Sequence, residues 1–307
     1  VRAVRLRRAF LGPRCARPPN LLARQTSAWA GYNNRVIFLA WFFILFLPVA
    51  AEAQERAATS SPLTRAEGEE FLLRAGIVSE RRYPGVIYAW RVSLDDGKRK
   101  HDARVETEDG STPSQRDYRF NVAAYELDKA LELNLVAPSV ERTVKGQPAS
   151  VTWWVDDVAM AEVDRRRKKI EPPDPDGWNK QIQAVRVFDE LISNMYRAVS
   201  PGHDLDTMWG ELLITRDWRI WLIDHTRTFR ISKQLRNPQS LTQCDRTLLG
   251  KLRELNKAVW KQRLGRYLTS EQLDGLEARR ELLVKHFDEQ IARKGEGAVL
   301  YDLPPRR

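Results

Sequence analysis

Cysteine and histidine are scarce in this chain, and their scarcity excludes several classes of site. The 307 residues contain 2 cysteines and 4 histidines, and no C-x-x-C pair occurs. A zinc site built from cysteine and histidine needs three or four such ligands at short spacing, so we expect none. Cys15 lies in the leader described below, which leaves Cys244 as a small packing residue without a disulfide partner.

Sequence motifs of two common active sites are also missing. The chain has no G-x-G-x-x-G loop and no Walker A loop, the glycine-rich segments that hold phosphates through backbone N–H groups. It has no G-x-S-x-G segment, which argues against a serine hydrolase of the nucleophile-elbow type.

Positive charge is abundant but unevenly distributed. The formal net charge is +10, and residues 1–53 contribute +7 of it, from eight arginines and one acidic residue. The remaining residues therefore carry only +3, which argues against a nucleic-acid partner. With 42% hydrophobic residues and 10 tryptophans, this remaining part can build a substantial core.

The basic leader has the three parts of a secretory signal peptide. Arginine-rich sequence up to Arg35 precedes the uncharged run 36–51, and Ala51-Glu52-Ala53 provides a cleavage site. Its apolar core, Val36 to Leu47, is shorter than the roughly 18–20 residues that span a membrane. We expect export, with periplasmic or extracellular localisation; the alternative is an uncleaved N-terminal membrane anchor.

Residues 54–157 show the pattern of a small α+β unit. A linker with a short helix fills 54–84, where Thr64 and Glu67 form a capping box. Strands are expected at 85–94 and 101–107, joined by a turn at 95–97. Apolar spacing predicts a helix over 118–133, and SVTWWVDD predicts a strand over 150–157.

The stretch 185–230 is the centre of the second half. Apolar residues at three- and four-residue spacing predict a helix from about 182 to 197. ELLIT and RIWLID then predict a hairpin over 211–224 that places Asp224 at the exit of a strand. A carboxylate fixed there is well placed to hold a cation against a phosphate. Further helices are expected at 245–267 and 269–293.

Two polar segments outside this stretch could also bind ligands. The five cations 165–169 could contact an acidic partner or a membrane surface, but such runs are commonly solvated helix ends. His203, Asp204 and Asp206, close to Glu211, could recruit a divalent ion, although turns have the same composition.

The central stretch and the 118–133 helix together resemble a known family. A helix followed by a loop, a hydrophobic hairpin ending in I-D-H, and a preceding V-A-A-Y-x-L-D helix resemble the phosphatidylinositol 3- and 4-kinase-like and bacterial toxin-kinase-like proteins. The resemblance implies a two-lobed α+β protein-kinase-like fold, with a small β-rich N-lobe over 85–157 and a helical C-lobe over 158–295. Residues 296–307 form a tail.

The resemblance also implies roles for individual residues. ATP with Mg²⁺ or Mn²⁺ would bind between the lobes, with Asp224 and Glu211 on the metal, Arg197 steadying the loop, and Trp153, Trp154 and Val155 bordering the adenine. The position of the catalytic aspartate is occupied by Tyr196, whose phenol is a proton donor rather than a base at neutral pH.

Other expected catalytic residues are replaced as well. The metal-binding asparagine position is Glu211, the phosphate-binding lysine position is near Glu106, and its glutamate partner is Asn121. We therefore interpret the chain as an exported, catalytically degenerate kinase-fold protein that binds a nucleotide or an unidentified protein or small-molecule partner. The alternatives are an active metal-dependent phosphotransferase that uses Asp224 and Glu211, and a periplasmic interaction protein that binds no nucleotide.

Overall fold

The computed structural model describes residues 64–82, 88–108, 116–194, 197 and 211–304. Within these ranges the chain belongs to one compact unit, Ser60–Arg307. The leader, Tyr196, and the cluster of His203, Asp204 and Asp206 lie outside the described residues. No described helix is both long enough and apolar enough to cross a membrane.

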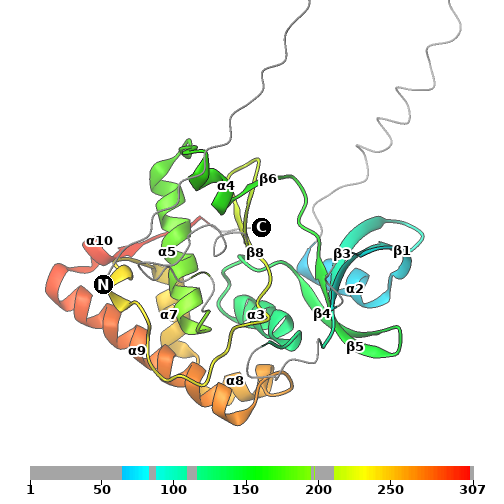
Figure 1. Cartoon of the computed structure of the whole chain (residues 1–307). Coiled ribbons are helices and arrows are strands. Elements are labelled where there is room, and N and C mark those ends of the chain that lie inside the picture. Colours follow the sequence, from blue (N-terminus) through cyan, green and yellow to red (C-terminus); the bar gives the residue numbers. More distant parts are fainter. Residues whose placement is uncertain (1–63, 83–87, 109–115, 195–196, 198–210, 305–307) are drawn as a thin grey trace, which may run out of the picture. The chain divides into compact units, whose positions relative to one another are not determined.

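A five-stranded antiparallel sheet forms the first half of the unit (Figure 1). Its strands are arranged in the order β1-β2-β3-β5-β4, and α2 (Arg65–Arg74) packs against β4 and β5. The strands are β1 (Gly76–Arg82), β2 (Ala89–Asp95), β3 (Lys100–Glu106), β4 (Ser139–Val144) and β5 (Gln147–Trp153). This mixture of antiparallel sheet and helices confirms the predicted α+β class.

Local sequence explains most of this sheet. The turn between β2 and β3 uses Gly97 with a φ of +83°, and its N–H donates to the Asp95 side chain at 2.8 Å. Lys145 and Gly146 both have positive φ, which joins β4 to β5 in a two-residue hairpin. The Thr64–Glu67 capping box at the start of α2 is present as predicted.

We predicted a linker with a short helix over 54–84, so β1 was not expected. This edge strand pairs with β2, and all but one of its residues are exposed. It lacks the alternation of buried and exposed residues by which a half-buried strand is recognised. Backbone pairing, rather than side-chain burial, holds it in the sheet.

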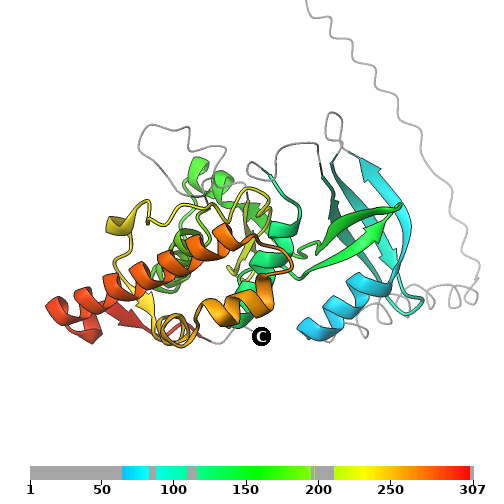
Figure 2. The ribbon, with the colours of Figure 1, turned by 90° about the horizontal axis from the view of Figure 1, so that it is seen from below.

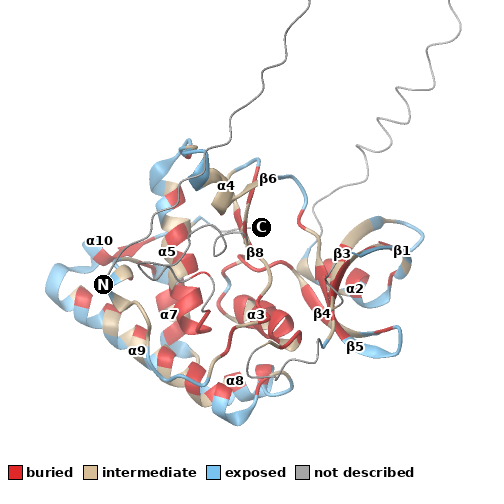
Figure 3. Cartoon of the chain, in the orientation of Figure 1, coloured by how far each residue is buried: buried red, intermediate tan, exposed pale blue. Residues whose placement is uncertain are grey.

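The helix α3 (Arg119–Ala130) lies between the sheet and the C-terminal helices in both ribbon views (Figures 1 and 2). It contacts β4, β5 and α8, and eight of its residues are buried. The burial colouring shows the helix red on most of its surface (Figure 3). Its apolar residues join the core of the helical half, whereas the sheet and α2 have a smaller core of their own.

A second, three-stranded sheet carries the predicted hairpin. It has the order β6-β7-β8, with β6 (Val158–Ala161), β7 (Leu212–Thr215) and β8 (Ile220–Leu222) all antiparallel. The chain that follows α3 joins this sheet, because the Leu222 N–H donates to the Leu135 carbonyl at 2.8 Å. Asp224 follows β8 in the left-handed region, with a φ of +51°.

Helices make up most of the second half. They are α4 (Glu162–Arg167), α5 (Pro175–Leu191), α7 (Arg246–Glu254), α8 (Lys257–Leu264), α9 (Ser270–Lys294) and α10 (Glu296–Val299), with the 3-10 turn η1 (Pro238–Ser240). Two short parallel strands, β9 (Cys244–Asp245) and β10 (Leu300–Tyr301), join the end of the chain to the start of α7.

The helix α5 ends earlier than its apolar pattern predicts. Asp174 caps it, so that it begins at Pro175, and it stops at Leu191 and not near Arg197. Ser193 has a φ of +52°, and the Asn194 N–H turns back to the Asp189 carbonyl at 2.8 Å. The prediction of a helix up to Arg197 is therefore wrong, because this turn redirects the chain.

The basic run 165–169 is partly structural. Arg165 and Arg166 both bind the carboxylate of Glu162, which is buried in α4, and Arg165 also donates to the Ile170 carbonyl. Arg167, Lys168 and Lys169 are exposed. Two of the five cations are thus engaged in stabilising α4.

Candidate functional site

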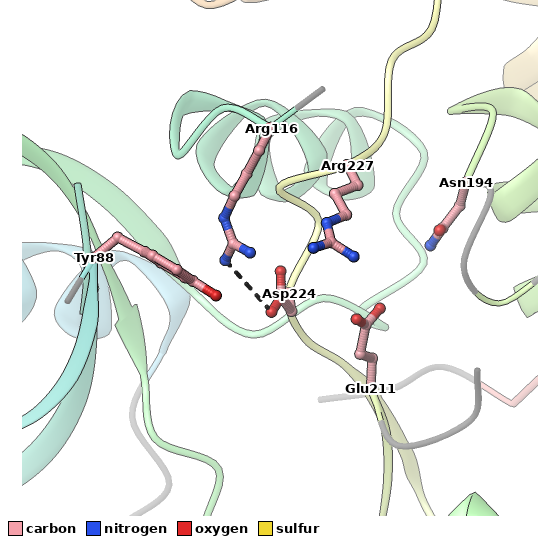
Figure 4. Close-up of a pocket in the computed structure, with 6 residues that line it drawn as sticks. All are labelled: Tyr88, Arg116, Asn194, Glu211, Asp224 and Arg227. Atoms are coloured by element: carbon pink, nitrogen blue, oxygen red, sulfur yellow. Dashed lines mark ion pairs between the residues drawn. The ribbon is translucent and has the colours of Figure 1, made fainter. Parts of the chain in front are cut away.

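A polar pocket of about 220 Å³ forms where the ends of five elements meet (Figure 4). Tyr88 precedes β2, Arg116 precedes α3, Asn194 follows α5, Glu211 precedes β7, and Asp224 and Arg227 follow β8. The lining residues that the structure describes are Tyr88, Arg116, Asn194, Glu211, Asp224 and Arg227. Asp224 and Glu211, which the sequence analysis paired, therefore lie in one pocket.

Arginine side chains hold the carboxylate of Asp224. Its Oδ2 atom lies 3.0 Å from Nη2 of Arg104 and 3.9 Å from Nη2 of Arg116, and its Oδ1 accepts from the Thr226 hydroxyl at 2.6 Å. Burial by itself raises the pKa of Asp224, but Arg104, Thr226 and Arg116 together lower it below its ordinary value. Asp224 is therefore an ionised carboxylate with cationic partners.

Glu106 and Asn121, the expected lysine and glutamate positions, are in direct contact. The Asn121 side-chain amide donates to Oε2 of Glu106 at 2.6 Å, and its own oxygen accepts from the His225 N–H at 2.8 Å. Oε1 of Glu106 accepts from Arg104 at 2.9 Å and from Arg116 at 3.1 Å. A hydrogen bond thus joins the two positions, and Asn121 links β3 to the chain after β8.

Burial controls the protonation of the groups around this contact. Burial, and then the charge of Asp224, raises the pKa of Glu106, while Arg104 and Arg116 oppose that shift. Burial, and then the charge of Arg197, holds the pKa of His225 well below its usual value, so its imidazole is neutral. His225 is fixed through its backbone and is not available as an acid at neutral pH.

Glu211 has few stabilising contacts for a half-buried carboxyl group. Its Oε2 atom makes no hydrogen bond and lies 3.8 Å from Nη1 of Arg197. Burial, followed by the charge of Asp224, raises the pKa of Glu211 to about 8. Glu211 is therefore largely protonated at neutral pH when the pocket holds no ligand.

Arg197 is anchored between the last turn of α5 and the exit of β8. Its Nε donates to both carboxylate oxygens of Asp189 at 3.1 Å, and its Nη1 donates to the Ile223 carbonyl at 3.0 Å. The side chain is fully buried. It ties the end of α5 to the exit of β8, which positions Asp224.

The residues predicted to border an adenine do not line this pocket. Trp153 stacks on His101 with ring centroids 3.6 Å apart, and Phe71 meets its edge. Trp154 lies beneath the guanidinium of Arg91, and Val155 is buried. Both tryptophans therefore pack on side chains of the first half, and the structure does not bring 153–155 together with Asp224.

Sequence reasoning missed Tyr88, Arg104, Arg116 and Arg227. Arg104 could have been found, because it precedes Glu106 by two residues in β3 and so lies on the same face of the strand. The other three lie in connecting segments whose periodicity carries no signal. Only the folded chain brings Tyr88 and Arg116 to Asp224, whereas Arg227 is three residues from it in the sequence.

The surroundings of Asp224 and Glu211 do not fit a divalent cation. Mg²⁺ and Mn²⁺ prefer ionised or neutral oxygen ligands. Here the guanidinium groups of Arg104 and Arg116 already lie 3.0 Å and 3.9 Å from the Asp224 carboxylate, and their positive charges would repel a cation at that position. Among the described residues there is no group of three or more His, Cys, Asp or Glu side chains that could hold a metal.

Comparisons with known proteins add little to this geometry. No family model and no curated protein matches the chain. Among solved structures the chain is similar to the Helicobacter pylori proinflammatory kinase CtkA, at 10% identity and a TM-score of 0.43. The match covers 73% of this chain and 98% of that one. An identity and a TM-score this low carry no argument about function.

Proposed function

We propose that the chain is an exported protein with a two-lobed kinase-like fold that binds a ligand in its cleft without efficient phosphoryl transfer. The order of elements supports this proposal. A five-stranded sheet with a packed helix precedes a short connection and a helical half, and the β7–β8 hairpin ends at Asp224 in a pocket between them.

The contact between Glu106 and Asn121 carries the proposal. Phosphoryl transfer depends on cations that neutralise the charge developing on the transferred group. At the lysine position this chain has a buried carboxyl group, fixed by Asn121, Arg104 and Arg116. Arg104 links Glu106 to Asp224, so the expected metal ligand Asp224 is bound by an arginine of the same network.

The sequence supports the same conclusion at the position of the base. Tyr196 replaces the aspartate that accepts the proton of the substrate hydroxyl. Loss of a general base typically lowers a rate roughly 10²–10⁴-fold. With the phosphate-binding lysine also replaced, we expect turnover to fall below detection.

An ATP turnover assay with Mg²⁺ or Mn²⁺ tests this function. The wild type should show no more turnover than Asp224→Ala, and the double variant Tyr196→Asp with Glu211→Asn should gain little while Glu106 remains. Metal-dependent turnover by the wild type that Asp224→Ala abolishes would instead establish the active phosphotransferase. Absence of binding to any nucleotide or phosphate would favour an interaction protein without a nucleotide.

The N-terminal leader supports the proposed export. We expect the secreted protein to begin at Gln54, which N-terminal sequencing or intact mass would show. Recovery of the uncleaved chain from membranes would favour the anchor instead.

A further inference from the structure

Hydrogen-bond donors from four separate segments converge on the pocket. The guanidinium groups of Arg116 and Arg227, the hydroxyl of Tyr88 and the side chain of Asn194 approach it from different sides (Figure 4). Guanidinium groups carry five N–H donors in a planar fork, so each can bind several oxygen atoms at once. This arrangement suits an acceptor-rich anion more than a neutral or cationic ligand.

The carboxylate of Asp224 does not cancel this preference. Arg104, at 3.0 Å, and Arg116, at 3.9 Å, lie beside it, and both also bind Glu106, so that two arginines balance two carboxylates. Arg227 adds a further guanidinium to the lining, on the segment that follows Asp224. This third arginine is the source of the positive charge that we assign to ligand binding.

The dimensions of the pocket limit the ligand. A volume of about 220 Å³ is below the roughly 300–1,000 Å³ of pockets that bind drug-sized molecules. Tyr88 is the one aromatic side chain among the described lining residues, and none of these residues is aliphatic. The described part of the lining therefore offers polar contacts suited to a charged group.

We propose that this pocket binds the phosphate group of a small ligand directly, through Arg116 and Arg227, without a divalent cation. The inference rests on the proposed function, in which the cleft binds but does not transfer. Phosphate is favoured over a carboxylate because its oxygens point in tetrahedral directions, whereas those of a carboxylate lie in one plane. Donors that approach from several sides match the tetrahedral group.

Isothermal titration calorimetry on the full chain tests the proposal. Inorganic phosphate and phenyl phosphate are titrated in EDTA at constant ionic strength, and then in excess Mg²⁺. We expect saturable binding in EDTA, with a Kd that Mg²⁺ changes by less than about twofold. Tighter binding of inorganic phosphate would assign the site to free phosphate, and tighter binding of phenyl phosphate to a phosphomonoester.

Substitution of Arg227 locates the site. Arg227→Gln should weaken phosphate binding by about tenfold or more, since hydrogen bonds to charged groups are among the strongest in proteins. Arg227→Lys keeps the charge without the planar fork and should give an intermediate Kd. The control Arg263→Gln makes the same charge change on an exposed residue of α8 and should leave the Kd unchanged.

Two results would overturn the inference. One is phosphate binding that appears only when Mg²⁺ or Mn²⁺ is added, and the other is an Arg227→Gln variant that is folded by circular dichroism and binds as tightly as the wild type. The ATP turnover assay stays separate from both. Turnover would overturn the proposed function without changing the phosphate Kd measured in EDTA.

Discussion

Two arginine–carboxylate clusters lie near the end of α5 and the exit of β8. They differ in how far their side chains are shielded from solvent. In one, Arg197 binds both oxygens of Asp189 and the Ile223 carbonyl, and its side chain has no exposed surface. In the other, Arg104 and Arg116 bind Asp224 at the wall of the pocket, and the Arg104 side chain is 30% exposed.

The difference separates a structural role from a binding role for the same pair of chemical groups. The Arg197 cluster is closed to solvent. It therefore contributes to the position of the chain at the exit of β8 and to the stability of the fold. The Asp224 cluster opens on a cavity, where guanidinium groups can exchange contacts with a ligand. Removing a partner from each cluster should therefore affect different properties.

The largest expected effect is on the closed cluster. Arg197→Met should lower the free energy of unfolding by about 3–5 kcal/mol, because it leaves the carboxylate of Asp189 buried without its cation. Urea denaturation measures the change, and Arg263→Met, on an exposed residue, should stay within about 0.5 kcal/mol of the wild type. A loss below about 1 kcal/mol for Arg197→Met would contradict the structural role.

The second effect concerns the open cluster and depends on pH. The pKa of Glu211 is raised from 4.5 to about 8 in the folded protein, so the folded state binds its proton more tightly than the unfolded state does. Its stabilising contribution is complete below about pH 4.5 and is lost as the pH rises towards 8. Across this window the wild type should lose up to about 1.4 kcal/mol per pH unit relative to Glu211→Gln.

Urea denaturation in EDTA at several pH values between 5 and 8.5 gives the slope of unfolding free energy against pH for the wild type and for Glu211→Gln. Identical slopes for the wild type and Glu211→Gln would show that Glu211 does not titrate in this range. Arg197→Met provides the contrast, since that variant should lower the free energy of unfolding at every pH in the series.

The smallest effect is the coupling between Arg104 and Asp224. A double-mutant cycle with Arg104→Gln and Asp224→Asn should give a coupling free energy of about 1 kcal/mol, because the pair is partly open to solvent. The exposed pair Arg253–Asp288 is the matched control and should give less than about 0.5 kcal/mol. Equal couplings in the two cycles would mean that the pocket wall is no different from the surface.

Local patterns in the sequence were sufficient for many of the elements. The Thr64–Glu67 capping box, the 95–97 turn and the apolar stripe of α3 depend on residues close together in the chain, and all three appear as expected. The hairpin that ends at Asp224 belongs to the same group. These features form because short-range hydrogen bonds and side-chain periodicity decide them.

Other features follow from packing between distant segments. The end of α5 coincides with a long-range contact, in which the Phe229 N–H donates to the Ile192 carbonyl at 2.6 Å, and the apolar stripe of the helix does not reveal it. The edge strand β1 exists because β2 offers it a partner, and its exposed side chains give no sign of it.

The candidate site shows the same division most clearly. The sequence alone determined that Asp224 stands at the exit of a strand. The catalytic replacements at Glu106, Asn121 and Tyr196 stay predictions that rest on the resemblance. Only the tertiary structure brought Arg116, Tyr88 and Asn194 to the pocket of Asp224, from loops that have no periodicity of their own. Such loops are positioned by the elements they connect, and the charge balance of the pocket is therefore a property of the folded chain.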